Sequence, residues 1–268
     1  MIDSVEFDKC ISIMRTFFKV KGFLEVHTQS CLSVLCEDPT NMITFQYANK
    51  VWPLPQTGQL WLDYEMLKNP HRVPGYFCVS TSYRNEQVDE IISPIFEFQL
   101  KGGIDEMIQL ERELLEFIGF KSNENNANYP EEKYSMVAER YGVDELLHEH
   151  EIKIGEDYGD VFFLKHFPIY TSSFWNMKQN VEVSKVDVII HGIETICSYE
   201  RCTDPVEMRN RFVTFRNGQY AIILYNTFGK ERVEQELDSF LNHNFIQMSG
   251  GCISITRMIR AMKLSNLM

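Results

Sequence analysis

The sequence predicts an α+β fold, in which antiparallel strands pack against amphipathic helices. Its clearest signal is the stretch 79–98, where two β-leaning segments flank a polar, acidic loop and predict an antiparallel hairpin with a long connection. Two other stretches predict helices, because apolar residues recur at helical spacing after residue 3 and again over 106–120. Strand and helix patterns therefore occur in the same chain.

Composition and charge limit the kind of protein. The chain has 268 residues, 44% of them hydrophobic, which predicts one large domain or two small ones with a sizeable core. We find no apolar run of membrane-spanning length and no signal peptide before the first helix. Seven cysteines without a C-x-x-C pair disfavour a disulfide framework and a zinc site, which fits a cytoplasmic location. The net charge of -12 disfavours a large nucleic-acid footprint but allows a local basic patch.

The first helix is predicted to begin near Asp3 or Ser4, and Asp3 with Glu6 has the spacing of a capping box. Gly22 ends it, and 23–26 reads as the start of a strand. One apolar stripe on this helix predicts core packing or an oligomer face; it consists of Phe7, Cys10, Ile11, Met14, Phe17 and Phe18.

A second junction follows at 53–59, where two prolines and Gly58 precede a helical segment at 60–67. Gln59 would therefore lie where an extended segment meets a helix. Side-chain amides at such junctions often contact ligands, and a structural cap is an equally good interpretation.

The hairpin carries the first candidate binding residues. A strand period of two places Arg84 and Glu86 on the same face. The guanidinium can hold an anion, and the carboxylate can accept a hydrogen bond from the amino group of a base. Nucleotide recognition needs that combination.

Strand and helix patterns alternate in the second half of the chain. A helical region is predicted at 130–147, and the adjoining His148 and His150 join its solvated face, with a metal role as the alternative. Strands are predicted at 161–164, 174–177 and 186–190, followed by a strand pair over 211–225 around the Asn217-Gly218 turn.

Asp187 and Glu194 are carboxylates seven residues apart across a His191-Gly192 bend. Paired carboxylates on adjacent strand segments can hold a hard cation such as magnesium beside a phosphate. Acidic residues near strand ends are, however, usually just solvated.

Near the end of the chain, a glycine pair at 250–251 enters a short apolar strand that runs into a helix near Arg257. An arginine at a helix start adds its charge to the positive end of the helix dipole. This makes a good anion site.

These features occur in a familiar order. Almost the whole chain resembles the catalytic core of class II aminoacyl-tRNA synthetases, whose three signature motifs are matched by 21–26, by 83–86 closing at 97–98, and by 250–257. In the aspartyl, asparaginyl and lysyl branch, 54–60 resembles the amino-acid-binding segment and 187–201 the metal-and-substrate strand pair. The resemblance implies a six- to seven-stranded, mainly antiparallel sheet flanked by helices, usually in a homodimer. It also implies that ATP and an amino acid form an aminoacyl adenylate.

The resemblance implies a role for each candidate residue of the nucleotide site. Arg84 would bind the α-phosphate and the substrate carboxylate, and Arg257 would bind the γ-phosphate, so these two are the candidate catalytic residues. Glu86 would accept a hydrogen bond from the adenine amino group, and Phe98 would stack on the ring. The implied magnesium ligands are Asp187 and Glu194.

Glu37, Gln59 and Arg201 are the implied amino-acid contacts. Glu37 lies in a loop that resembles the family's mobile substrate-capping loop. A guanidinium at Arg201 suits a carboxylate or amide side chain, whereas the lysyl branch has a carboxylate there. Leu62 stands where the aspartyl branch has a lysine. These positions favour aspartate or asparagine as the substrate, with lysine a distant third.

Some positions depart from the family pattern without removing the central charges of the ATP site. The loop 87–94 lacks the usual Arg-His element, and the other departures are Gln29 for a motif 1 proline, Cys197 for a serine, and Cys252 and Ser254 for glycines of motif 3.

No segment resembles an anticodon-binding domain, so we expect one catalytic domain over 1–268 and do not expect tRNA as a partner. The chain then resembles a free-standing paralogue, such as the archaeal asparagine synthetase related to asparaginyl-tRNA synthetase. We favour a ligase that passes the activated amino acid to ammonia or another small amine. The alternatives are aminoacyl transfer to a protein or to tRNA, and a non-catalytic regulatory protein that binds an amino acid or a nucleotide.

Overall fold

The computed structural model describes residues 2–28, 32–85, 92–121, 128–172 and 174–268. The strands in these ranges are β1 (Leu24–Glu25), β2 (Thr44–Tyr47), β3 (Lys50–Pro53), β4 (Gly75–Tyr83), β5 (Ile92–Lys101), β6 (Glu131–Lys133), β7 (Val161–Phe167), β8 (Val183–Ile190), β9 (Ile193–Glu200) and β10 (Met248–Ser254). The helices are α1 (Ser4–Val20), α2 (Gln59–Lys68), α3 (Ile104–Ile118), α4 (Tyr134–Tyr141), α5 (His148–Tyr158), α6 (Pro205–Thr214), α7 (Gln219–Phe228), α8 (Lys230–Leu241) and α9 (Ile255–Leu264).

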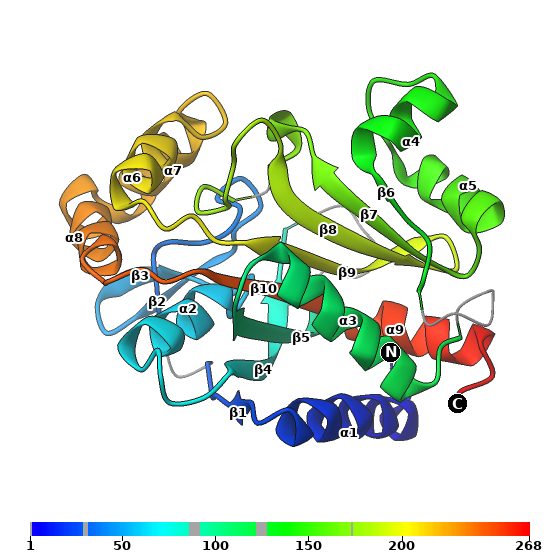
Figure 1. Cartoon of the computed structure of the whole chain (residues 1–268). Coiled ribbons are helices and arrows are strands. Elements are labelled where there is room, and N and C mark those ends of the chain that lie inside the picture. The colour runs from blue at the N-terminus through cyan, green and yellow to red at the C-terminus, as the bar shows by residue number, and fades with distance from the viewer. Residues whose placement is uncertain (1, 29–31, 86–91, 122–127, 173) are drawn as a thin grey trace.

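One central sheet organises the fold (Figure 1). In the described part of the chain it has eight strands in the order β1-β4-β5-β10-β9-β8-β7-β6, and β2 pairs with β3 in a separate hairpin. The six inner strands of this order, from β4 at one end to β7 at the other, pair antiparallel with their neighbours. The edge strands β1 and β6 pair parallel with β4 and β7. The α+β fold with a mainly antiparallel sheet is therefore confirmed. The two short edge strands raise the strand number above the expected six to seven.

The predicted hairpin is formed by β4 and β5. Its register runs from Gly75 opposite Leu100 to Tyr83 opposite Ile92, so the connection is long, as predicted. Glu86 and most of this connection lie outside the described residues.

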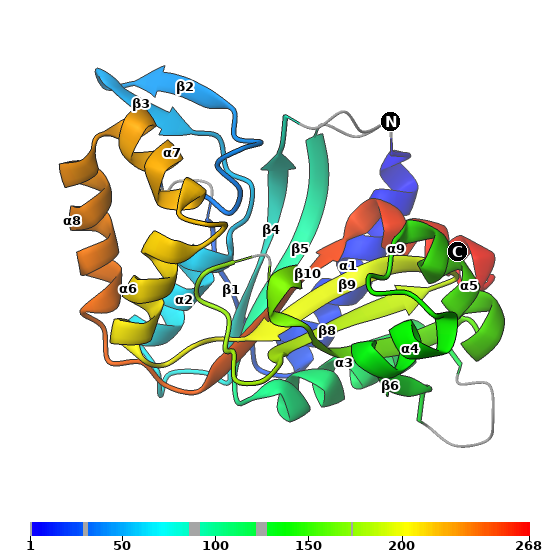
Figure 2. The same ribbon diagram turned by 90° about the horizontal axis from the view of Figure 1, so that it is seen from above.

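Helices α1, α3 and α9 cover one face of the sheet (Figures 1 and 2). Asp3 caps α1 as predicted, because its carboxylate accepts hydrogen bonds from the backbone N–H groups of Val5 and Glu6 at 2.9 and 3.1 Å. The α1 stripe is buried except for Phe7, which is partly buried. The ring of Phe18 lies 5.0–5.6 Å from three rings of β4 and β5, those of Phe77, Phe96 and Phe98. It therefore packs in the core.

The opposite face of the sheet is covered by α2, α4 and α5 and by the group α6–α8 beside the hairpin β2/β3 (Figure 2). The fully buried Trp175 packs edge-on against Phe212 and Phe240, which anchors α6 and α8 to this face. Among the described helices, none is both long and apolar enough to traverse a bilayer.

Three element predictions were wrong. Residues 211–225 form parts of α6 and α7, because the left-handed residues Asn217 and Gly218 turn one helix into the next and not one strand into another. Residues 174–177 form no strand; Met177 makes only an isolated bridge to Arg201. The region 130–147 holds the strand β6 and the short helix α4, with a loop after it.

Candidate functional site

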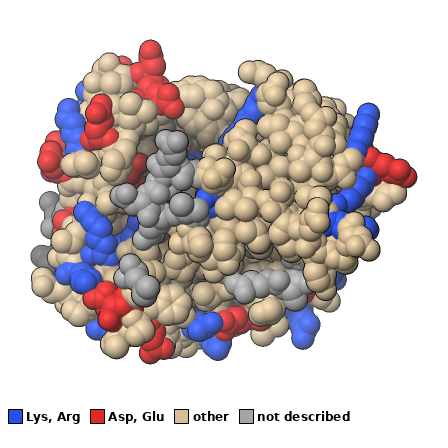
Figure 3. Space-filling view, turned by 180° about the vertical axis from the view of Figure 1, so that it is seen from behind, with Lys and Arg blue, Asp and Glu red and all other residues tan. Residues whose placement is uncertain are grey.

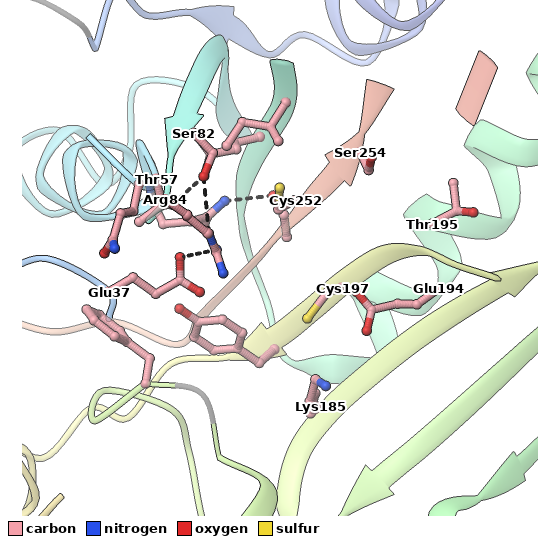
Figure 4. A pocket seen from close by; sticks show the side chains of 17 residues that line it. Glu37, Thr57, Ser82, Arg84, Lys185, Glu194, Thr195, Cys197, Cys252 and Ser254 are labelled. Atoms are coloured by element: carbon pink, nitrogen blue, oxygen red, sulfur yellow. Dashed lines mark hydrogen bonds and ion pairs between the residues drawn. The ribbon is translucent and has the colours of Figure 1, made fainter. Parts of the chain in front are cut away.

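A cavity of about 280 Å³ lies on the second face of the sheet, where the end of β4 approaches β9, β10 and the start of α2 (Figure 4). Strand alternation supplies part of this lining, since alternate residues such as Cys197 and Tyr199 of β9 and Cys252 and Ser254 of β10 line the cavity. The charged and polar side chains that line it include Glu37, Gln59, Arg84, Glu97, Lys185, Glu194 and Tyr199.

Arg84 and Glu37 meet inside this cavity. Arg84 Nη2 donates a hydrogen bond to Glu37 Oε2 at 2.7 Å, and Arg84 Nε donates to Ser82 Oγ at 3.2 Å (Figure 4). Burial raises the pKa of Glu37, and the charge of Arg84 opposes that rise. The fold thus brings together two residues that the sequence predicted separately as a phosphate and a substrate contact.

Gln59 begins α2 and lines the same cavity. Its side-chain amide donates to the backbone carbonyl of Gly251 at 2.7 Å, and its carbonyl oxygen accepts from Arg201. The residue therefore has structural partners and also faces the cavity, so both interpretations of Gln59 are retained.

Arg201 is placed differently from the expectation. Its side chain is 1% exposed and does not line the cavity. Its Nε donates to both carboxylate oxygens of Asp63 at 3.1 and 3.2 Å, and Nη2 donates to Gln99 Oε1 at 3.0 Å. The ring of Tyr199, which does line the cavity, lies 4.0 Å from the guanidinium. An ion pair of Arg201 and Asp63, which has no net charge, thus lies behind the Tyr199 ring.

Asp63 is not among the residues predicted from the sequence, and no role is predicted for Tyr199. A signal for Asp63 was present, because it follows Gln59 by one helical turn and so shares a face of α2 with it. Its partner could not be found from local spacing, since Arg201 lies 138 residues further along the chain.

Phe98 lies on the other face of the sheet and does not line the cavity. It is 0% exposed and packs against Phe18 of α1, so the expected stacking on an adenine ring does not fit its position. Its neighbours in alternate positions on β5, Ile95 and Glu97, line the cavity instead.

Glu97 is fully buried at the wall of the cavity. Its carboxylate accepts hydrogen bonds from the backbone N–H of Gly58 at 2.7 Å, from Ser80 Oγ at 2.6 Å and from Thr57 Oγ1. Burial raises its pKa, and these three donors oppose the rise. Glu97 therefore fixes the segment that leads into Gln59.

Asp187 and Glu194 lie on neighbouring strands, as predicted. Glu194 lines the main cavity, whereas Asp187 lines an adjoining cavity of about 190 Å³, which also includes Glu194. Lys185 lines both cavities, and its Nζ lies 2.7 Å from Asp187 Oδ2. The carboxylate of Asp187 keeps the pKa of Lys185 above its usual value, although burial opposes this.

Arg257 is the third residue of α9, the helix that directly follows β10. Its Nη1 donates to the backbone carbonyl of Glu194 at 2.6 Å and lies 3.6 Å from Glu194 Oε1. The side chain is 48% exposed and lies next to the cavity residue Glu194, at the first turn of α9. It therefore has the position expected of an anion contact at a helix start.

Comparison with known proteins identifies the family. The family described as "tRNA synthetases class II (D, K and N)" matches residues 6–265. The chain belongs to this family. Among curated members, the aspartate–tRNA(Asp/Asn) ligase of Methanopyrus kandleri is 24% identical over 219 residues, which are 70% of this chain and 50% of that protein.

Solved structures of the class II family share the fold. Asparaginyl-tRNA synthetase from Pyrococcus horikoshii, complexed with asparaginyl-adenylate, is similar with a TM-score of 0.73 and 18% identity, over 96% of this chain and 64% of that one. The aspartyl-tRNA synthetase of Entamoeba histolytica gives a TM-score of 0.71 and 16% identity, over 96% and 54%. The chain thus spans about half to two thirds of the length of these relatives.

Class II synthetases of this family in general use ATP and Mg²⁺. A magnesium ion held by this chain would need free carboxylate oxygens at Asp187 and Glu194. Across the described ranges, no three or more His, Cys, Asp or Glu side chains are grouped to hold a metal ion, and this includes His148 and His150. The carboxylate of Asp187 is already paired with the Lys185 ammonium. These residues do not fit a magnesium ion held by Asp187 and Glu194.

Proposed function

We propose that the protein activates aspartate or asparagine with ATP and passes the aminoacyl group to ammonia or another small amine. The observation that carries this proposal is the convergence of Arg84, Glu37 and Gln59 on one cavity. In the first step, the substrate carboxylate attacks the α-phosphorus of ATP. The bond to the β-phosphate breaks and pyrophosphate leaves. In the second step, the amine attacks the acyl carbon, the bond between that carbon and the phosphate oxygen breaks, and AMP and a proton are released.

Arg84 supports this step because its guanidinium can hold the substrate carboxylate and an α-phosphate oxygen together. In the protein without substrate this guanidinium is paired with Glu37. The ammonium group of an arriving amino acid would take over the Glu37 carboxylate. Arg84 would then be released for the developing negative charge, while Arg257 contacts the far end of the triphosphate.

The surroundings of Arg201 bear on the side chain of the substrate. The ion pair of Arg201 and Asp63 has no net charge and lies behind the Tyr199 ring, so it offers no free cation to a second carboxylate. An uncharged amide should therefore fit better than a second carboxylate. We expect asparagine to be favoured over aspartate.

The charge of the protein supports a small acceptor. With a net charge of -12, the chain offers little attraction for a polyanion. On the face seen in Figure 3, Lys and Arg side chains are interspersed with Asp and Glu around a broad uncharged area.

The homodimer usual for the family stays a prediction, which sedimentation equilibrium would test.

ATP–pyrophosphate exchange with each amino acid separately tests the activation step. We expect exchange with asparagine or aspartate, and a loss of about 10²–10³-fold in Arg84→Ala. Arg209→Ala is the matched control, because that arginine has a similar exposure, 40% against 36%, and lies on α6. The acceptor would be found by adding ammonium, bulk tRNA or protein and following the labelled amino acid. An absence of exchange, with nucleotide or amino acid still binding in calorimetry, would favour the regulatory alternative.

A further inference from the structure

Three charged side chains share one face of the strand pair β8/β9, beside the main cavity. Across these strands Lys185 is opposite Tyr199, Asp187 is opposite Cys197, and Ile189 is opposite Glu194. The register shifts between Val188 and Ile189, which leaves one extra residue on β9. This bulge brings Glu194 to the face on which Asp187 and Lys185 lie.

The ammonium of Lys185 is held among these groups. Its Nζ lies 2.7 Å from Asp187 Oδ2 and 4.0 Å from the centre of the Phe167 ring. The two charged side chains are only 10% and 7% exposed. A lysine so enclosed is a fixed positive charge and not a solvated one.

The position of this charge is the one that a divalent ion would need. A magnesium or manganese ion held by Asp187 and Glu194 would have to lie within about 2.0–2.2 Å of their oxygens. Lys185 lines the same two cavities as Glu194 and already contacts Asp187, so the ion and the ammonium would compete for one place. Figure 4 shows Lys185 on the strand next to Cys197 and Glu194.

We infer that Lys185 is a built-in cation that takes the place of a protein-held divalent ion at Asp187 and Glu194. The positive charge that this part of the cavity presents to a phosphate then comes from a side chain. A magnesium ion that arrives with ATP belongs to the substrate. The inference concerns binding by the protein alone and does not depend on the proposed reaction.

Removal of the Lys185 ammonium should convert the space beside Asp187 and Glu194 into a metal site. In the described residues, Asp187 Oδ1 is buried without a hydrogen-bond donor, so an oxygen is left for an incoming ion. Lys185→Met keeps an unbranched apolar side chain against Phe167 and removes the ammonium. Lys133→Met is the matched control, because Lys133 makes an exposed ion pair with Glu182 at 3.2 Å.

The experiment titrates Mn²⁺ into the protein without nucleotide and follows binding by electron paramagnetic resonance and the shift in unfolding temperature. We expect Lys185→Met to bind one Mn²⁺ at least tenfold more tightly than the wild type and the Lys133→Met control. The added substitution Asp187→Asn should abolish that gain. Lys185→Arg, which keeps the charge, should behave like the wild type.

Two results would overturn the inference. One is a wild-type protein that binds Mn²⁺ as tightly as Lys185→Met and loses the ion on Asp187→Asn. The other is a folded Lys185→Met variant that gains no Mn²⁺. If Lys185→Met does not fold, the comparison of wild type with Asp187→Asn decides alone: equal, weak Mn²⁺ binding supports the inference, and binding that requires Asp187 refutes it.

Discussion

Replacing Asp63 with asparagine should lower the free energy of unfolding by about 3–5 kcal/mol, because the Arg201 guanidinium would then be buried without a counter-charge. Both side chains are 1% exposed, so water cannot replace the lost carboxylate. Asparagine has the shape of aspartate and can keep the contact with Asn176 at 3.2 Å. The substitution therefore removes a charge and little packing.

The loss can be measured by urea unfolding and by the shift in melting temperature. A change of 1 kcal/mol moves the melting temperature of a domain of 150–250 residues by about 2–4 °C. This chain is slightly longer, at 268 residues, so the lower part of that range applies. The expected shift is then about 6–15 °C.

An exposed ion pair provides the control for this experiment. Glu182 pairs with Lys133 at 3.2 Å, with side-chain exposures of 30% and 50%. Glu182→Gln should cost less than about 1 kcal/mol, because solvent screens such pairs. In addition, the double variant Asp63→Leu/Arg201→Met should recover most of the loss, since an apolar pair has no charge to compensate. A loss in Asp63→Asn as small as that in Glu182→Gln would refute the reasoning.

Further predictions concern other buried groups. Burial raises the pKa of Glu111 to about 8, so the folded state binds this proton more tightly than the unfolded chain. Between about pH 4.5 and 8 the stability of the wild type should therefore fall by about 1.4 kcal/mol per pH unit relative to Glu111→Gln, and parallel urea-unfolding profiles would contradict this. Gly250→Ala should cost about 1–3 kcal/mol, because its Cβ would lie 2.0 Å from Gln99 Oε1; an unchanged melting temperature would count against the described packing. Tyr199→Ala should expose Arg201 to the cavity and raise the affinity for aspartate relative to asparagine in calorimetry. An unchanged ratio of the two affinities would show that Arg201 takes no part in substrate recognition.

Much of the fold could be predicted from local pattern. The helical stripe of α1, its Asp3 cap and the β4/β5 hairpin follow from spacing that acts over a few residues, and the structure confirms them. The prediction over 211–225 failed for the same local reason. An Asn-Gly pair favours left-handed backbone angles, and those angles can connect helices as well as strands.

The candidate site likewise combines features that local sequence pattern predicts with features that only tertiary packing sets. By itself, the sequence determined that Arg257 lies in the first turn of a helix, because helix starts follow from local pattern. The predicted shared face of Arg84 and Glu86 stays a prediction, since Arg84 follows the last residue of β4 and Glu86 lies outside the described residues. Only the tertiary structure decided that Arg201 is neutralised by Asp63 and that Lys185 faces both cavities. Those outcomes depend on which buried charges meet when distant segments pack, and burial makes each such charge require a partner.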